Sequence, residues 1–252
     1  MSRKDRRSIE TQRLLRRFGR CAASVALLAL STLSGAGLLR AETAGEDQAD
    51  ASSAMTLQVD ATQLHRHLLR SEMTYPTEPG ERWFWYPQWI PGVHGPSGQA
   101  TNLAEVIFED EQGNRLPWRR DALNLCRFGV AVPSDVHRIR IRLTYIANQP
   151  TTISRGVDSY GTSRLLVVNF NTCVLYPEGK SVSEMPVKVR LRLPWQWQAG
   201  SALREAGPRQ EGWVEYETAS LENVIDAPVV AGRHFRRLEF EEPGVPPTRF
   251  HI

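Results

Sequence analysis

The segment Val136–Tyr145 constrains the fold of this chain more than any other stretch. Arginines at positions 138, 140 and 142 alternate with isoleucine, isoleucine, leucine and tyrosine at positions 139, 141, 143 and 145. Side chains of a β-strand point alternately to its two faces, so this pattern predicts a strand with one face in a core and one in water. A helix would mix the two kinds of residue on every side.

Other segments repeat this pattern. Val187–Leu193 has lysine and arginine at positions 188, 190 and 192, between Val, Val, Leu and Leu. Further strands are expected in the following segments: Met55–Val59, Gln63–Tyr75, Trp83–Trp89, Leu103–Phe108, Leu116–Trp118, Leu165–Phe170, Trp213–Thr218 and Phe235–Phe240. Only Ser220–Asp226 is weakly helical. Many short strands separated by turn signals predict an all-β fold, an antiparallel β-sandwich with little helix.

The rows of basic residues raise the question of an anionic partner. The simpler interpretation is a solvated sheet face, because these residues stand where the alternation requires polar side chains. Residues 42–252 carry 22 basic and 26 acidic residues. This mildly acidic body provides no electrostatic footprint for nucleic acid.

The first 41 residues have the composition of a targeting segment. They hold nine Arg and Lys against two Asp and Glu, and Cys21–Leu39 is an uncharged apolar run. This pattern predicts an export signal over residues 1–41, with cleavage after Ala41, and a periplasmic or secreted protein. Nineteen apolar residues could also span a bilayer, so an uncleaved membrane anchor is the alternative. Residues 42–54 are small and polar and are expected to form a flexible tether, with the β-sandwich over residues 55–252.

Two cysteines, Cys126 and Cys173, follow the signal segment. In an oxidising compartment they could form a disulfide. Two separate buried thiols are an equally good interpretation, because two cysteines alone do not define a pairing.

The stretch Trp83–Leu103 combines aromatic residues with a loop rich in proline and glycine. Five aromatic residues lie between positions 83 and 89, and three of them are tryptophans at positions 83, 85 and 89. Even spacing places these tryptophans on one face of a regular strand, as either a core stripe or a binding stripe. The large gain from burying indole rings favours the core.

Known catalytic motifs provide little support for an enzymatic function of this chain. The sequence contains neither H-E-x-x-H nor C-x-x-C. Gly95–Gln99 lacks the second spaced glycine of a nucleophile elbow. His65 and His67, spaced two apart on an expected strand, could share a zinc ion with His94 or His137, although histidines with no metal role are the simpler interpretation.

Four short motifs occur in a fixed order along the chain. They are Trp89–His94 (W-I-P-G-V-H), Asn102-Leu103 followed by the Phe108–Trp118 hairpin, Leu193–Trp197 (L-P-W-Q-W), and Tyr216 and Leu221 followed by Asp226–Gly232 (D-A-P-V-V-A-G). In this order and spacing the chain resembles the N-terminal domain of the glycyl aminopeptidase-type metallopeptidases, metallopeptidase family sixty-one, over Leu57–Phe240.

This resemblance implies a β domain that precedes a helical zinc-binding catalytic domain with H-E-x-x-H. No position of this chain matches those zinc ligands, so no catalytic residue, cofactor or metal site is assigned to it, and zinc is expected only in a catalytic domain. The expected partner is such a domain or a peptide substrate. The residues expected nearest to it lie in two loops: Trp89, Pro91, Gly92, His94, Asn102, Asp226, Pro228 and Gly232.

The sequence thus favours a noncatalytic domain of an exported aminopeptidase-like metallopeptidase, standalone or truncated. The alternative is a standalone secreted module that binds peptide or carbohydrate through its tryptophans. A third hypothesis is a small metalloenzyme built on His65, His67 and His94.

Overall fold

The computed structural model of the chain describes residues 54–90, 92, 94–97, 100–148, 157–241, 243–244 and 248–251. The expected signal (1–41) and nearly all of the expected tether (42–54) lie outside these residues. Within the described part, no helix is both long and apolar enough to cross a bilayer.

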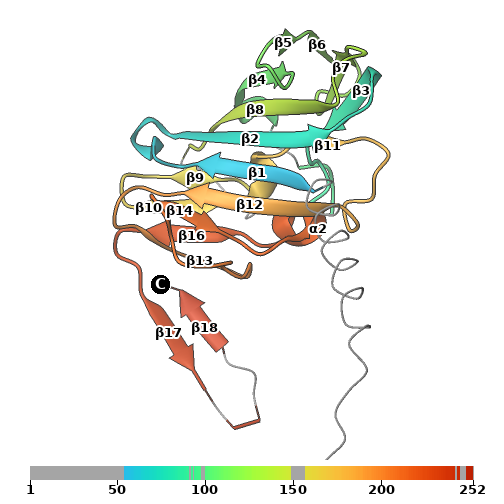
Figure 1. The fold of residues 1–252 in the computed structure, drawn as a ribbon. Coiled ribbons are helices and arrows are strands. Elements are labelled where there is room, and N and C mark those ends of the chain that lie inside the picture. Colours follow the sequence, from blue (N-terminus) through green and yellow to red (C-terminus); the bar gives the residue numbers. More distant parts are fainter. Residues whose placement is uncertain are drawn as a thin grey trace, which may run out of the picture. The chain divides into compact units, whose positions relative to one another are not determined.

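The largest of the described sheets has eight strands (Figure 1). Its strand order is β14-β12-β1-β2-β8-β4-β5, and β15 also pairs with β12. The strands are β1 (Met55–Asp60), β2 (Leu68–Pro76), β4 (Leu103–Glu109), β5 (Arg115–Leu116), β8 (Arg138–Ile146), β12 (Pro186–Arg192), β14 (Trp213–Glu215) and β15 (Ala219–Ser220). The all-β fold predicted from the alternating segments is confirmed.

Strand β8 shows why the alternation was informative. Ile139, Ile141 and Leu143 are buried, whereas the arginines between them face outward. Acidic residues of neighbouring strands pair with these arginines: Arg140 Nε lies 3.5 Å from Glu72, and Arg142 binds Glu109. The basic rows are therefore an outer sheet face balanced by acids, as the sequence indicated.

One pair of strands departs from the antiparallel expectation. β1 runs parallel to β12, with Met55 opposite Val187 and Asp60 opposite Arg192. Parallel neighbours need a long crossover connection, and here everything from β2 to β11 lies between them in the chain. The pairing of such distant segments leaves no local signal in the sequence.

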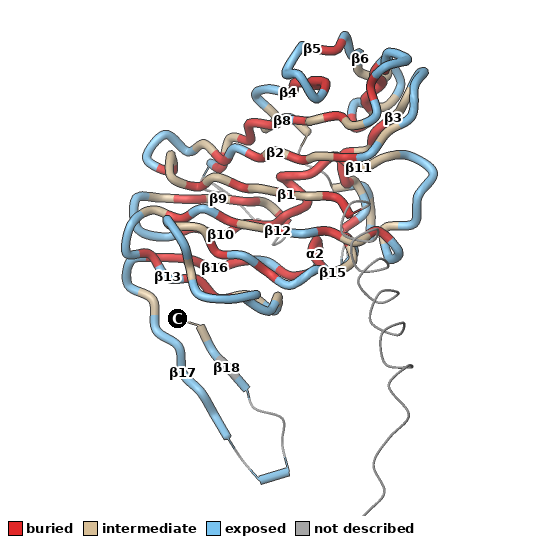
Figure 2. The backbone as a smooth tube through the Cα atoms, in the orientation of Figure 1, coloured by how far each residue is buried: buried red, intermediate tan, exposed pale blue. Residues whose placement is uncertain are grey.

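Two smaller antiparallel sheets complete the core. One has the order β11-β3-β7-β6 and the other β13-β16-β10-β9. Their strands are β3 (Gly80–Trp85), β6 (Trp118–Arg120), β7 (Arg127–Val132) and β11 (Tyr176–Pro177), and β9 (Tyr160–Gly161), β10 (Leu165–Val168), β13 (Gln198–Ser201) and β16 (Val229–Gly232). Buried residues of both small sheets and of the large sheet form one hydrophobic cluster, which Figure 2 shows in red.

A line of aromatic rings joins the β3–β7 sheet to the large sheet. Tyr75 of β2 contacts Phe84 of β3 at 5.7 Å between ring centroids, and Phe84 contacts Phe108 of β4 at 5.6 Å. Phe108, Trp118 and Phe128 continue the line. Such tilted pairs stabilise a core beyond the area that they bury.

The expected strand Gln63–Tyr75 begins five residues late. Its first part forms the short 3₁₀ helix η1 (Leu64–Arg66), which His67 ends in the left-handed conformation with φ of 56°. Leu64 is the buried residue of this turn and packs against Gly161. Packing of one leucine thus overrides the strand pattern at this point.

The short helix predicted at Ser220–Asp226 is confirmed as α2 (Leu221–Ile225). Ser220 caps it by accepting a 3.3 Å hydrogen bond from the Asn223 amide, and Asp226 follows the last turn. Two further 3₁₀ turns, η2 (Ala100–Asn102) and η3 (Phe170–Thr172), lead out of the proline-glycine loop and out of β10.

The last described segments form a separate hairpin, β17 (Arg237–Phe240) and β18 (Thr248–His251). Leu238, Phe240 and Phe250 are exposed, and the two phenylalanine rings meet edge to face. At its end, the ring of His251 lies against Phe235 and directly over Gly200 of β13.

Candidate functional site

Trp83 and Trp85 lie on the outer face of their sheet, not in the core, and Trp89 lies in the loop after β3. Phe84 and Tyr86 are the buried residues of this stretch, whereas Trp83 and Trp85 are half-buried. The expectation that the tryptophans form the core is therefore wrong. The alternation was right, but the phenylalanine and tyrosine took the inner face.

Arginine side chains cover Trp83 from outside. The Arg127 guanidinium lies 4.0 Å from the ring centroid and that of Arg119 lies 5.0 Å away. Arg127 also donates to both carboxylate oxygens of Glu178 and, at 2.9 Å, to Asp121. These carboxylates raise the pKa of Arg127 above its usual value, the Glu178 hydrogen bond contributing most. With its arginines in place, Trp83 presents no free ring face to a sugar.

Trp89 is exposed on one of two loops that a hydrogen bond joins, and the other loop carries two exposed leucines. The loop after β3 is closed by a 2.8 Å hydrogen bond from the Ser97 amide to the Gln88 carbonyl. The Gln88 side chain in turn donates to Asn124 at 2.7 Å and so holds the loop before β7 beside it. Trp89 is 69% exposed, Leu123 99% and Leu125 61%. These three side chains are called the loop patch below.

A tight turn forces the two leucines outward. The Asp121 carboxylate accepts hydrogen bonds from the amides of Leu123 and Asn124, and Asn124 accepts one from the Cys126 amide. Hydrogen bonding, first from Leu123 and then from Arg127, lowers the pKa of Asp121. Neither leucine is among the site residues expected from the sequence. A short L-N-L-C run beside a turn gives no sign of which way its apolar residues face.

The other expected loop residues lie mostly on the surface. Gly92, with φ of 78°, and His94 are exposed, and Pro91 lies outside the described residues. Asn102 is half-buried in η2 and its side-chain amide donates to the Tyr145 hydroxyl at 3.3 Å. Asn102 therefore anchors this loop to β8 more than it presents a surface.

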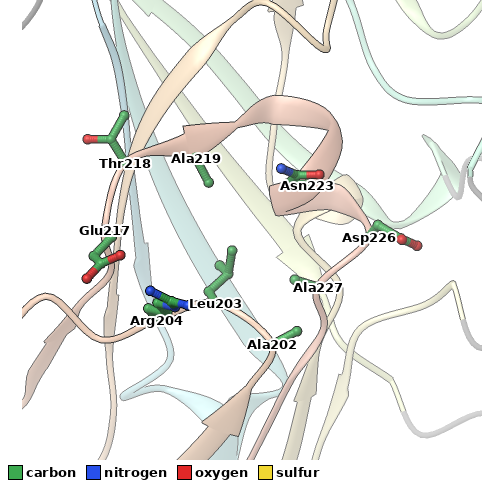
Figure 3. A pocket seen from close by; sticks show the side chains of 9 residues that line it. All are labelled: Ala202, Leu203, Arg204, Glu217, Thr218, Ala219, Asn223, Asp226 and Ala227. Carbon is green, nitrogen blue, oxygen red and sulfur yellow. The ribbon is translucent and has the colours of Figure 1, made fainter. Parts of the chain in front are cut away.

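The second expected loop belongs to a different sheet. Asp226 and Pro228 are exposed, whereas Gly232 is buried at the end of β16, where an added Cβ would approach the Arg164 carbonyl to 3.0 Å. Asp226 lies beside a shallow groove of about 330 Å³ (Figure 3). The groove is lined by Ala202, Leu203, Arg204, Glu217, Thr218, Ala219, Asn223, Asp226 and Ala227.

This groove is polar, and its hydrogen bonds are structural. The Glu217 amide donates to the Arg204 carbonyl at 2.9 Å, and the Leu203 amide donates to the Ser201 hydroxyl at 3.2 Å. A larger hollow of about 600 Å³ shares Leu203, Arg204 and Glu217 and reaches Arg237 and His251 of the hairpin. Both are lined by acidic as well as basic residues, so neither favours one sign of ligand charge.

The histidine hypothesis fails on geometry. His65 and His67 lie in and after η1 rather than on a strand, so spacing of two does not place them on one face. His67 Nδ1 lies 3.0 Å from the Gly161 carbonyl. The described residues contain no group of three or more His, Cys, Asp or Glu side chains arranged to hold a metal ion.

Cys126 and Cys173 are both buried free thiols in this structure, and the pairing that the sequence allows stays a prediction. Burial raises the pKa of the Cys173 thiol to about 12. Such a thiol is a poor nucleophile at neutral pH.

Residues 56–233 match the family model of the peptidase M61 N-terminal domain. This match spans most of the chain and all three sheets of the core. The chain belongs to this family. The resemblance drawn from the four sequence motifs is thereby confirmed, and the protein contains an N-terminal domain of the kind found in peptidase-like proteins.

One solved structure shares the fold of this M61-type domain. An aminopeptidase N family protein from Idiomarina loihiensis superposes with a TM-score of 0.66 at 19% identity, covering 78% of this chain and 32% of that protein. An M1 zinc metallopeptidase from Deinococcus radiodurans gives a TM-score of 0.43 at 13% identity, covering 79% of this chain and 46% of that protein. The chain thus spans about a third of the length of the Idiomarina protein. A comparison with curated protein sequences gives no match.

Proposed function

We propose that this M61-type domain is noncatalytic and serves as the docking and supporting domain for a peptidase catalytic domain. The observation that carries the proposal is the family match over residues 56–233. The loop patch provides a surface suited to this role. Exposed large apolar side chains on adjoining loops are typical of surfaces that another protein covers.

The loop patch lies where the family-like motif W-I-P-G-V-H begins. Trp89 opens that motif, and the Gln88–Asn124 hydrogen bond ties it to Leu123 and Leu125. An aromatic anchor beside two leucines matches the composition of interface centres, in which a few apolar residues carry most of the binding energy. In this proposal the patch contacts the catalytic domain, and the neighbouring proline-glycine loop borders the substrate cleft.

The test uses residues 55–252 together with the catalytic domain of a complete M61 peptidase, produced without its own N-terminal domain. We expect the two to bind and the kcat/KM of the catalytic domain to rise. The triple variant Trp89→Ser, Leu123→Ser, Leu125→Ser should bind at least about tenfold more weakly, since hot-spot truncations cost about 2 kcal/mol or more.

Trp195→Ser is the matched control, because Trp195 is 85% exposed in the turn between β12 and β13, outside the loop patch. Zinc-dependent hydrolysis of aminoacyl p-nitroanilides by residues 55–252 alone would contradict the noncatalytic role. Equal binding by the triple variant would exclude the loop patch as the docking surface.

A binding module for peptide or carbohydrate is the second candidate function. The exposed rings of Trp89 and Trp195 favour it, because indole faces bind both sugars and peptide side chains. Titration of tryptophan fluorescence with oligosaccharides and with peptides tests it. A response lost in Trp89→Ser or Trp195→Ser supports this candidate, and no response to either ligand class removes it.

The proposal includes export of the protein. It rests on the basic residues and apolar run of the first 41 positions. Amino-terminal sequencing of the protein recovered from the periplasm or medium should begin at Glu42. Recovery of the intact chain in the membrane fraction would instead identify a retained anchor.

A further inference from the structure

The hairpin of β17 and β18 has one apolar and one charged face. In its antiparallel register Leu238 lies opposite Phe250, and Phe240 follows two residues later on the same strand. Side chains two apart on a strand share a face, so these three side chains lie together. All three are exposed, and the rings of Phe240 and Phe250 meet at 5.4 Å between centroids. Arg237 and Glu239 belong to the opposite face.

This hairpin is incomplete as a sheet. Among the described strands, β17 and β18 pair only with each other, so both outer edges lack a neighbour. The buried cluster that unites the three core sheets includes no residue of either strand. A two-stranded hairpin is at best marginally stable in water, and a lasting sheet needs three or more strands with an apolar face or a covering element.

The charges of β17 suit a second copy of the same strand. Two β17 strands running antiparallel about a two-fold axis through Leu238 place Arg237 of each copy opposite Glu239 of the other. Opposite charges directly across an antiparallel pair stabilise it, and like charges destabilise it.

Other registers of the same two strands fit less well. An axis through Glu239 would place the two copies of this glutamate opposite each other. An axis between two residues would turn the apolar side chains of the two copies to opposite faces. The charge pattern and the apolar face therefore select the register centred on Leu238.

We propose that β17 is the interface of a symmetric homodimer. In this dimer two hairpins join edge to edge into one four-stranded antiparallel sheet with the order β18-β17-β17-β18. The contact is isologous and closes on itself, as in most homodimers. The joined sheet has the strand number that a single hairpin lacks, and its apolar face combines Leu238, Phe240 and Phe250 of both copies. The proposal does not depend on the docking of a catalytic domain.

The first test is the oligomeric state of residues 55–252, which contain the whole described core. Because the paired element is small, we expect a weak dimer whose fraction grows with protein concentration. Analytical ultracentrifugation at concentrations up to about 1 mM measures it. A monomer at every concentration would overturn the proposal. If Leu238→Ser then abolished binding of an M61 catalytic domain, that domain would be the occupant of the hairpin instead.

Charge reversal gives a signature that two-fold pairing of β17 alone produces. Arg237→Glu gathers four glutamates at the axis, and Glu239→Arg gathers four arginines. Each variant alone should therefore dimerise about tenfold more weakly. An equimolar mixture of the two restores both opposite-charge pairs and should associate as the native protein does.

Arg233→Glu is the matched control, because Arg233 is exposed and lies outside β17. It should dimerise like the native protein. All three positions lie outside the buried cluster, and far-UV circular dichroism checks that the variants fold. A mixture that associates no better than the single variants would overturn the proposed register.

A cysteine on the two-fold axis tests the register covalently. Directly opposite residues of antiparallel strands have Cα atoms about 4.5–5.5 Å apart, within the roughly 4.4–6.8 Å that a disulfide spans. Leu238→Cys should therefore form a disulfide-linked dimer in oxidised glutathione. In Phe240→Cys the two cysteines lie about 13 Å apart along the paired strands and should not cross-link.

The native cysteines do not interfere with this measurement, because Cys126 and Cys173 are buried. Non-reducing gel electrophoresis follows the linked dimer over time. Cross-linking of both variants at the same rate, or of neither, would overturn the proposal. Binding of a catalytic domain plays no part in the cross-linking and charge-reversal measurements, so this proposal and the proposed function can fail separately.

Discussion

At the scale of single residues, Gly129 shows how one missing side chain sets a surface. It lies in β7 opposite Trp83 of β3, and the indole ring occupies the space above it. A Cβ added at Gly129 would lie 2.9 Å from two atoms of the ring and 3.0 Å from a third. The ring therefore lies flat on the sheet, where Arg127 and Arg119 can stack on it.

We expect Gly129→Ala to lower the free energy of unfolding by roughly 1–3 kcal/mol, the usual cost of overpacking. The ring must tilt away, so its contact with Arg127 is lost as well. Urea denaturation measures the first effect and tryptophan fluorescence the second. Gly207→Ala is the control, because a Cβ there meets nothing within 4 Å. Equal stability of the two variants would show that the ring moves at no cost.

Asp110 stabilises the turn of the β4–β5 hairpin through its carboxylate. It accepts hydrogen bonds from the Asn114 side chain at 2.8 Å and from the amides of Gln112 and Asn114 at 3.0 and 2.7 Å. These bonds, that of the Asn114 side chain first, lower its pKa below the usual 3.8. Because the folded state holds the proton less tightly than the unfolded state, this stabilisation is present above the usual pKa and is lost as pH falls through the folded value.

Asp110→Ala should therefore unfold at a lower temperature than the native protein at pH 7, and the difference should narrow as the pH falls below 3.8. Thermal unfolding at pH 7 and at acid pH measures this. Asp135→Ala, at an exposed aspartate before β8, serves as the comparison. A difference that stays constant with pH would mean that the charge of Asp110 contributes nothing.

At the scale of elements, α2 is short enough to depend on its cap. Five residues form little more than one turn, so most of its stability comes from packing of Leu221, Val224 and Ile225 and from the cap at Ser220. The helix carries Asn223 on one edge of the groove that Asp226 borders. Loss of the cap thus affects both stability and the shape of this groove.

Ser220→Ala should lower the free energy of unfolding by about 0.5–2 kcal/mol, the range for N-cap serines. Urea denaturation measures it. Ser220→Asp should restore most of the loss, because aspartate caps equally well. A full loss in Ser220→Asp would point to packing rather than capping.

Some strands and strand pairings of the sheets can be predicted from the sequence, and others cannot. The strands β8 and β12 follow from alternation, and the β4–β5 hairpin follows from the turn residues between Phe108 and Leu116. The strand in Gln63–Tyr75 was placed too early, because Leu64 enters the core through a 3₁₀ turn that no period describes. The parallel pairing of β1 with β12 could not be predicted, since its register depends on everything folded between them.

At the scale of the whole molecule, one core serves three sheets. Phe128 of the β3–β7 sheet and Val229 of the β10–β16 sheet belong to the same buried cluster as the strands of the large sheet. No sheet can lose its packing without exposing another, which predicts a single unfolding transition.

We therefore expect far-UV circular dichroism and tryptophan fluorescence to give coincident urea transitions for residues 55–252. Phe128→Ala should lower the stability of the entire domain by about 3–5 kcal/mol, and Val229→Ala should shift the same transition. Two separate transitions, or a shift seen by one probe only, would show that the small sheets unfold independently.

For the candidate site, Gly92, His94, Asp226 and Pro228 of the two expected loops are exposed, and their place at an interface stays a prediction. The sequence did not reveal Leu123 and Leu125, whose exposure results from the Asp121 turn.

The sequence alone determined the all-β class and the family, because strand alternation, turn residues and the order of short motifs are local properties of the chain. Only the tertiary structure decided which face of β3 enters the core. At the end of that strand, Trp83, Phe84 and Trp85 put large aromatic rings on both faces, so hydrophobicity does not distinguish the faces. Phe84 fits between Tyr75 and Phe108, whereas Trp83 fits over a glycine and under two arginines. That choice depends on neighbours distant in sequence, and it leaves the tryptophans outside the core.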